Sequence, residues 1–218
     1  MDTNRAIAGF YFHRLLCRVF KGDDSRFVLK GGQSVLARTL DARVTRDIDL
    51  IKSYPNPLVA WSINTLDEEF KKDMDSAPTI KSRIEAMKQV HDAGIRTTCF
   101  ISPIFPGITD VFTIIEKIKD FCDYIWLENL NLRGTFKPTI INYIKEKHPE
   151  LNDLYNKIYT KKDMSYWEGL DKKVQEYADK NGFMYVIDEE PFLKNPTGKP
   201  IIINYFYHEK IRQLSKNK

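Results

Sequence analysis

From Leu58 onward, short apolar runs alternate with amphipathic segments, and this alternation constrains the fold more than any other feature. Apolar runs at 58–63, 97–101 and 124–127 predict strands buried on both faces, as in a parallel sheet. The residues between these runs include two sets with apolar side chains at helical spacing: Ile80, Ile84, Met87 and Val90, then Ile114, Ile115 and Ile118. Gly94 ends the first helix and Asp110 caps the second. Strands that alternate with helices imply right-handed crossovers, so we expect a parallel sheet or partial barrel.

The flanking segments carry different patterns. Residues 134–177 contain apolar stripes at helical spacing, and apolar runs at 183–187 and 201–203 predict two further strands. At the other end, residues 4–20 predict a helix and 27–29 a short strand. We therefore expect a helical extension on one side of the alternating region and a short α/β piece on the other.

Composition points to a folded domain outside the membrane. The chain has 218 residues, of which 42% are hydrophobic, and no apolar run is long enough to cross a bilayer. Its beginning lacks the basic-then-apolar pattern of a signal peptide. Three cysteines without a disulfide framework favour a reducing compartment. We expect a cytoplasmic protein with no membrane partner.

Positive charge is concentrated near the N-terminus. Residues 1–47 hold nine Lys or Arg against five Asp or Glu, while the net charge of the whole chain is +4. A basic segment of this kind favours nucleotides or nucleic acid, because it attracts phosphate groups. A solvated helix face explains the same charges equally well, so a nucleic-acid partner stays an open expectation.

Polar residues follow each strand of the alternating region. They are Ser62 and Asn64, then Ser102, then Glu128 and Asn129. The carboxyl ends of parallel strands form the ligand face of α/β folds, so these five residues predict a binding site. The alternative for any single residue is that its side chain caps the helix that follows.

The same region resembles a known family. The stretches Trp61–Glu68, Phe100–Asp110 and Trp126–Gly134 read WSINTLDE, FISPIFPGITD and WLENLNLRG, and they look like radical S-adenosylmethionine proteins. The branch they resemble most contains spore photoproduct lyase and DNA repair photolyase relatives, over about residues 45–218. The resemblance implies a partial parallel (βα) barrel made of the last three strands of a six-unit barrel, with a helical C-terminal extension.

The resemblance also implies cofactors. In the family, S-adenosylmethionine lies at the barrel mouth beside a [4Fe–4S] cluster, which donates the electron that cleaves it to a 5′-deoxyadenosyl radical. Ser62 and Asn64 would lie beside S-adenosylmethionine, and Ser102, Glu128 and Asn129 would line the same mouth. These five residues are the expected cofactor-binding set.

The cysteines depart from the family pattern. Cys17, Cys99 and Cys122 are too far apart to form a Cys-x3-Cys-x2-Cys loop. We therefore expect no [4Fe–4S] cluster, no catalytic residues, and at most binding of an adenosyl or nucleotide ligand without radical chemistry. Cys99 and Cys122 are expected to be buried small apolar residues.

The first fifty residues carry a second pattern. Gly31, Gly32 and Ser34 follow a predicted strand, where backbone can approach a phosphate, and Asp47 and Asp49 could hold Mg²⁺. Residues 4–50 are similar to nucleotidyltransferase toxins of abortive-infection systems. That resemblance implies a Mg²⁺-dependent nucleotidyltransferase, with the first three residues on the nucleotide and the two aspartates on the metal.

The position of the two aspartates is open. The alternation Asp47, Ile48, Asp49, Leu50 suits a strand, whereas Val44, Ile48 and Ile51 are spaced as on a helix, which we favour slightly. We expect a fragment over 1–50 joined to a half barrel with its extension over 51–218, which suggests a fusion. A third possibility is an inactive remnant or an interaction module.

Overall fold

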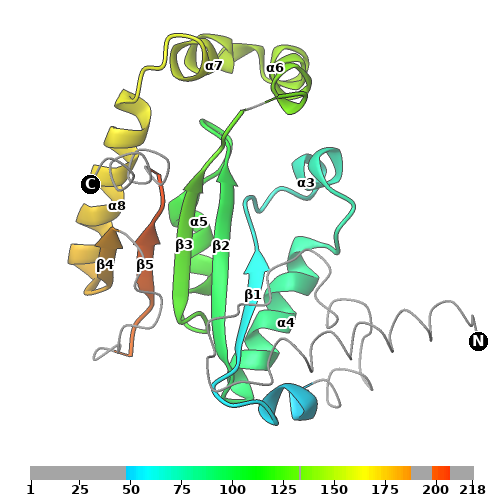
Figure 1. Cartoon of the computed structure of the whole chain (residues 1–218), viewed down its shortest axis with the longest axis vertical. Coiled ribbons are helices and arrows are strands. Elements are labelled where there is room, and N and C mark those ends of the chain that lie inside the picture. Colours follow the sequence, from blue (N-terminus) through cyan, green and yellow to red (C-terminus); the bar gives the residue numbers. More distant parts are fainter. Residues whose placement is uncertain (1–47, 133, 188–197, 207–218) are drawn as a thin grey trace, which may run out of the picture.

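All five strands of the sheet run parallel (Figure 1). The computed structural model describes residues 48–132, 134–187 and 198–206. Within them the strand order is β1-β2-β3-β5-β4. The strands are β1 (Leu58–Ser62), β2 (Arg96–Ile104), β3 (Tyr124–Asn129), β4 (Met184–Ile187) and β5 (Ile201–Asn204). The expected parallel α/β sheet is confirmed, and the sequence-predicted strand near 201 lies inside it, between β3 and β4.

Helices connect the strands and extend beyond them. Residues 48–52 are helical. The remaining helices are α3 (Glu68–Met74), α4 (Ile80–Asp92), α5 (Val111–Ile118), α6 (Phe136–Lys147), the 3₁₀ helix η2 (Pro149–Leu151), α7 (Asn152–Tyr159) and α8 (Ser165–Asn181). The helix cap predicted at Asp110 is confirmed: its side chain accepts a hydrogen bond from the amide of Thr113 at the start of α5.

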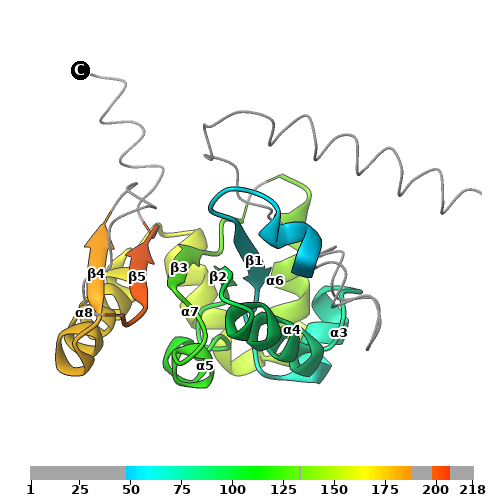
Figure 2. The ribbon, with the colours of Figure 1, turned by 90° about the horizontal axis from the view of Figure 1, so that it is seen from below.

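The main hydrophobic core lies between one face of the sheet and α4, α5 and α8, which Figure 2 shows on the same side of the strands. Val59, Trp61 and Ile63 reach this core from β1 and the residue after it. Side chains alternate along a strand, so the residues between them lie on the other face. The core face is fully buried, which leaves the opposite face as the place where polar strand residues gather.

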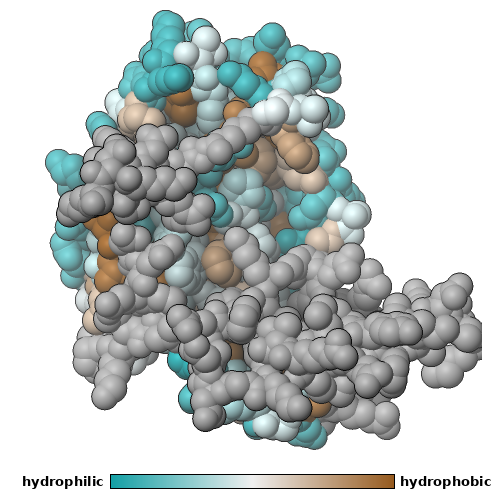
Figure 3. Space-filling view, viewed as in Figure 1, coloured by the Kyte–Doolittle hydropathy of each residue, from teal (hydrophilic) through white to brown (hydrophobic). Residues whose placement is uncertain are grey.

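A second cluster covers the carboxyl ends of the strands. Phe70 of α3, Ile144 of α6 and Tyr155 of α7 pack with Phe105 and Leu130, which directly follow β2 and β3. Figure 1 shows α6 and α7 above the tips of β2 and β3. In the space-filling view, hydrophilic residues predominate along this upper rim, with separate hydrophobic patches among them (Figure 3). We call α3, α6 and α7 the cap.

Two elements differ from the sequence prediction. The strand predicted over residues 97–101 continues to Ile104, and its pairing with β3 shifts between Ile101 and Ile104. A local irregularity of this kind tolerates a proline, which has no amide hydrogen to donate. The short helix α3 was not predicted. It starts because the Asp67 carboxylate accepts from the amides of Glu69 and Phe70.

Candidate functional site

Hydrogen bonds join three of the predicted site residues across three strands. The Ser62 hydroxyl donates to the backbone carbonyl of Ser102 over 2.9 Å. The Ser102 hydroxyl in turn donates to Glu128 Oε2 over 2.6 Å. All three side chains are partly exposed. The carboxyl ends of β1, β2 and β3 therefore present one connected polar group, which we call the serine–glutamate chain.

Register places this chain on the face opposite the main core. Ser62 pairs with Phe100, and Phe100 pairs with Trp126. Ser102 and Glu128 lie two residues further along their strands and so share this face, because strand side chains repeat every two residues. The apolar cluster on this face comes from strand residues and Tyr205, the residue after β5. The hydrogen-bonding side chains and the aromatic rings therefore lie on the same face of the sheet.

The two predicted asparagines have different positions. The Asn64 carbonyl accepts a hydrogen bond from Thr109 Oγ1 over 2.8 Å, which ties the end of β1 to the loop after β2. Asn129 follows Glu128 directly and so points to the other face of β3. Asn64 thus contributes to the edge of the site through its backbone carbonyl. The structure does not bring Asn129 together with the serine–glutamate chain.

Arg83 of α4 is a site residue that sequence reasoning missed. The side chain of Arg83 is 8% exposed. Nη1 donates to the Ser62 carbonyl over 2.9 Å and Nε to the Pro78 carbonyl over 2.9 Å, while Nη2 contacts both oxygens of Asp75. One guanidinium thus fixes the end of β1 against the segment between α3 and α4. An arginine on an amphipathic helix ordinarily indicates a solvated face, so no sequence signal could have found it.

Aromatic rings extend the site across the sheet. Trp126 stacks on Phe100, with ring centroids 5.5 Å apart and an interplanar angle of 25°, and it contacts Tyr205 at 5.1 Å. The Tyr205 amide donates to the Leu127 carbonyl over 2.8 Å. Phe100, Trp126 and Tyr205 are all partly exposed. A row of rings therefore crosses β2, β3 and the end of β5 beside the serine–glutamate chain.

A partly buried polar cluster holds the end of β5. Asn204 Nδ2 donates to Asp171 of α8 over 2.6 Å and lies 2.6 Å from the Tyr185 hydroxyl of β4, which itself contacts Asp171. The Asn204 side-chain oxygen accepts from the Phe206 amide over 2.7 Å. This cluster fixes the backbone on either side of Tyr205 and so helps to position its ring.

The two described cysteines lie in the interior, as expected. Cys99 and Cys122 are 0% and 3% exposed. Desolvation raises the pKa of Cys99 to about 12 and holds the pKa of Cys122 well above its usual value. A metal or cluster ligand must be a thiolate, which both environments disfavour. These two residues do not fit as ligands of an iron–sulfur cluster; Cys17 lies outside the described residues.

The nucleotidyltransferase prediction falls mostly outside the described residues. Gly31, Gly32, Ser34 and Asp47 all lie in the undescribed N-terminal part. Asp49 is exposed in the helical stretch 48–52, which agrees with the helical alternative rather than the strand. Across the described ranges, no three His, Cys, Asp or Glu side chains gather as a metal ion would require. The proposed Mg²⁺ site therefore has no support from the described residues.

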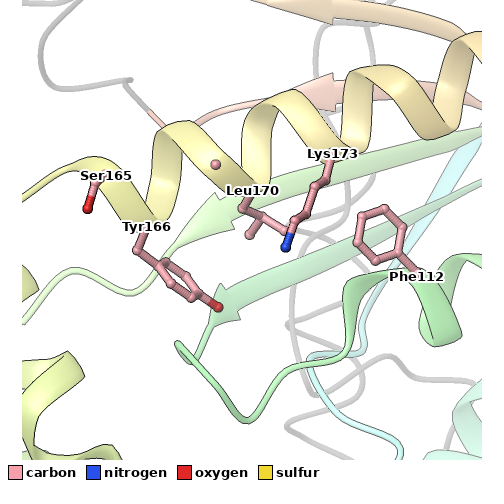
Figure 4. A pocket seen from close by; sticks show the side chains of 6 residues that line it. Phe112, Ser165, Tyr166, Leu170 and Lys173 are labelled. Carbon is pink, nitrogen blue, oxygen red and sulfur yellow. The ribbon is translucent and has the colours of Figure 1, made fainter.

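A surface hollow of about 300 Å³ lies away from this site, between α8 and the start of α5 (Figure 4). Tyr166, Leu170 and Lys173 line it from α8, and Phe112 lines it from α5. The Tyr166 hydroxyl accepts from the Gly107 amide over 3.1 Å. The hollow is on the helical side of the sheet and contains none of the predicted site residues.

Sequence comparison identifies the family. The profile of the Radical SAM superfamily matches residues 11–121. The chain belongs to this superfamily. The match begins within the segment that we assigned to a separate fragment, and the division near residue 50 stays a prediction.

Relatives with curated sequences are longer than this chain. An uncharacterized protein of Methanocaldococcus jannaschii is 36% identical over 110 residues, which cover 49% of this chain and 41% of the relative. An uncharacterized protein of Acidianus two-tailed virus is 28% identical over 145 residues, covering 61% and 48%. The chain thus spans less than half the length of these two relatives.

Solved structures show a weak likeness. SuiB of Streptococcus suis matches 52% of this chain and 29% of its own at 9% identity, with a TM-score of 0.38. The structure of SuiB bound to S-adenosylmethionine matches 46% of this chain and 27% of its own, with a TM-score of 0.34.

Within the described ranges of the present chain, no helix combines the length and apolar character that a membrane crossing requires.

Proposed function

We propose that this chain binds S-adenosylmethionine at the carboxyl ends of β1, β2 and β3 and does not by itself start radical chemistry. The observation that carries the proposal is the serine–glutamate chain, which joins Ser62, Ser102 and Glu128 on one sheet face of a Radical SAM superfamily member. In parallel α/β folds this end of the sheet is the usual place for a ligand.

The donor set suits an adenosyl ligand. S-adenosylmethionine carries ribose hydroxyls, an ammonium, a carboxylate and a sulfonium. Glu128 accepts hydrogen bonds from hydroxyl or ammonium groups, and Ser62 can exchange its bond to the Ser102 carbonyl for one to the ligand. Arg83 holds the end of β1 in place, since each of its three guanidinium nitrogens already donates to Pro78, Ser62 or Asp75. The ligand, when bound, would supply an activated sulfonium centre.

Radical initiation is not part of the proposal. Cleavage of the sulfonium in this family requires an electron from a [4Fe–4S] cluster, and this sequence contains no cysteine triad of the required spacing. Cys99 and Cys122 are buried with raised pKa values. We assign the chain to the branch that resembles spore photoproduct lyase as part of the same proposal, on the three stretches given above.

Isothermal titration calorimetry with S-adenosylmethionine tests the proposal. We expect one site, weakened at least about fivefold in Ser102→Ala, because the Ser102 hydroxyl is the link that orients Glu128. Ser165→Ala, at the exposed start of α8, is the matched control and should bind like the original chain. Binding of Mg²⁺–ATP or Mg²⁺–GTP with none of S-adenosylmethionine would favour the nucleotidyltransferase instead, and no binding of either would favour a remnant or interaction module.

Iron content tests the second half of the proposal. Protein purified without oxygen should contain far less than one cluster per chain. Stoichiometric iron and sulfide that remain bound through gel filtration would contradict our interpretation of the cysteines.

A further inference from the structure

The hollow between α8 and the start of α5 has apolar walls that neighbouring rings hold in place. Leu170 and the rings of Tyr166 and Phe112 form these walls (Figure 4). The Tyr166 ring makes an edge contact with Trp167, with centroids 5.1 Å apart, and the Phe112 ring lies 5.4 Å from that of Tyr177. A ligand that enters the hollow therefore meets rings already in position, so little side-chain entropy is lost on binding.

Gly169 leaves space at this hollow that no described residue fills. It lies inside α8, where a glycine lowers helix stability relative to alanine. A Cβ built at this position would meet no atom within 4 Å. Close packing among the described residues therefore does not account for the missing side chain. Its effect is to keep the hollow open beside Leu170.

Lys173 places a positive charge at the edge of the hollow. Figure 4 shows its side chain running back along α8 toward Leu170. Among the described residues, no carboxylate oxygen lies within 4.0 Å of its ammonium. The adjacent Lys172 differs, because its ammonium lies 3.9 Å from Glu176. An apolar depression with one uncompensated cation at its edge is complementary to a ligand that combines a ring or alkyl group with one negative charge.

The surroundings of the hollow favour a small molecule over a protein partner. Its volume of about 300 Å³ is at the lower end of the range for ligand pockets. A stable protein interface, by contrast, buries roughly 800 Å² on each partner. On the neighbouring surface of α8, the charged residues Glu168, Lys172 and Glu176 are exposed, so the apolar area does not continue there. The space suits one aromatic ring or one short alkyl chain.

We infer that this hollow binds a small aromatic or aliphatic carboxylate, with the apolar part against Phe112, Tyr166 and Leu170 and the carboxylate facing Lys173. This site is separate from the strand ends, and it does not depend on the function proposed for them. The apolar contacts supply most of the affinity, while the charge selects an anion over a neutral molecule of the same shape.

Two probes test the site by NMR titration of the ¹⁵N-labelled chain: 3-phenylpropionate and 3-phenylpropionamide. They share the ring and the chain, but only the first is charged. We expect the amide signals of residues 112 and 165–173 to shift, with a dissociation constant of about 1 mM or lower for the carboxylate and about threefold higher for the amide. Equal affinity for the two probes would overturn the role of Lys173, and failure of both to shift these signals would overturn the site.

Lys173→Met tests the charge. It should remove the preference for the carboxylate while leaving binding of the neutral probe nearly unchanged, because the apolar walls remain. Lys172→Met makes the same change on the adjacent lysine, which already has Glu176 as a partner, and is the matched control. An equal loss of preference in the two variants would show that the general positive charge of α8, rather than Lys173, attracts the ligand.

Gly169→Leu tests the space. The added side chain should fill the hollow and abolish binding of both probes, while the unfolding temperature should not fall, because leucine favours a helix more than glycine does and its Cβ meets no atom. Unchanged binding in this variant would contradict the inference. Self-association of the original chain that Gly169→Leu abolishes, measured by analytical ultracentrifugation, would place a second copy in the hollow and would also overturn it.

Discussion

At the scale of single residues, Arg83 shows how a charged side chain can be structural. Its guanidinium makes four hydrogen bonds, one to the Ser62 carbonyl, one to the Pro78 carbonyl and two to the Asp75 carboxylate. Hydrogen bonds from charged donors contribute more than neutral ones, and buried carbonyls left without donors are costly. The residue therefore acts on the site indirectly, through the position of Ser62.

Replacing Arg83 with methionine should lower the free energy of unfolding by about 2–3 kcal/mol, because the partly buried Ser62 and Pro78 carbonyls lose their donor. Urea denaturation measures the change. Arg96→Met is the control: Arg96 also donates to one carbonyl, that of Asn56, but near the exposed surface. If both variants lost the same free energy of unfolding, the burial of Arg83 would add nothing to the stability of the chain.

Cys99 should make stability depend on pH. Burial raises its pKa from 9.0 to about 12, so the folded chain holds the thiol proton that the unfolded chain releases. This contribution is fully present below pH 9 and is lost as pH rises from 9 toward 12, at up to about 1.4 kcal/mol per pH unit.

Urea unfolding of the original chain and Cys99→Ala between pH 7.5 and about 10.5 isolates this residue, since all other groups are common to both. The difference in unfolding free energy should be constant up to pH 9 and then shift against the original chain. A difference that stays constant over the whole range would mean that the Cys99 thiol ionises equally well in both states.

At the scale of elements, the central helices and strands were predictable because their signals are local. The apolar spacing of α4 and the cap at Asp110 both appear in the structure as expected. The extension of β2 through Ser102 and Pro103 was not predictable, because it depends on pairing with β3 beyond an irregular register. This extension matters for the site, since it carries the Ser102 hydroxyl to Glu128.

Two glycines allow the cost of backbone strain to be distinguished from the cost of a packing clash. Gly94 and Gly107 both have positive φ, +79° and +76°. A Cβ at Gly94 would meet no atom within 4 Å, whereas one at Gly107 would lie 2.8 Å from Leu151 Cδ2, beside the cap. Gly94→Ala should cost about 1–2 kcal/mol from strain alone, and Gly107→Ala about 1 kcal/mol more because Leu151 must move.

Thermal and urea unfolding of the two alanine variants compare these costs. The more informative quantity is the difference between them, because the strain is common to both. If Gly107→Ala proves no less stable than Gly94→Ala, the loop after β2 is not packed against the cap as described.

At the scale of the whole molecule, the sequence predicted the kind of fold but not the order of its strands. Apolar runs near 183 and 201 indicated two more strands, yet their place in the sheet follows from pairing between distant segments, β5 with both β3 and β4. The same limit applies to the site. Ser62, Ser102 and Glu128 were identifiable as strand-end residues, whereas Trp126 and Arg83 were not, because only the register and the helix packing bring them there.

The account's central claim is that S-adenosylmethionine binds at the carboxyl ends of β1, β2 and β3. Hydrogen–deuterium exchange with and without the ligand tests the location directly, since a bound ligand slows exchange where it stabilises local structure. We predict slower exchange in peptides covering 62–66, 102–106 and 128–132, and little change in α8. Protection confined to α8 and the start of α5, where the separate hollow lies, or the absence of any protection at saturating ligand, would contradict the claim.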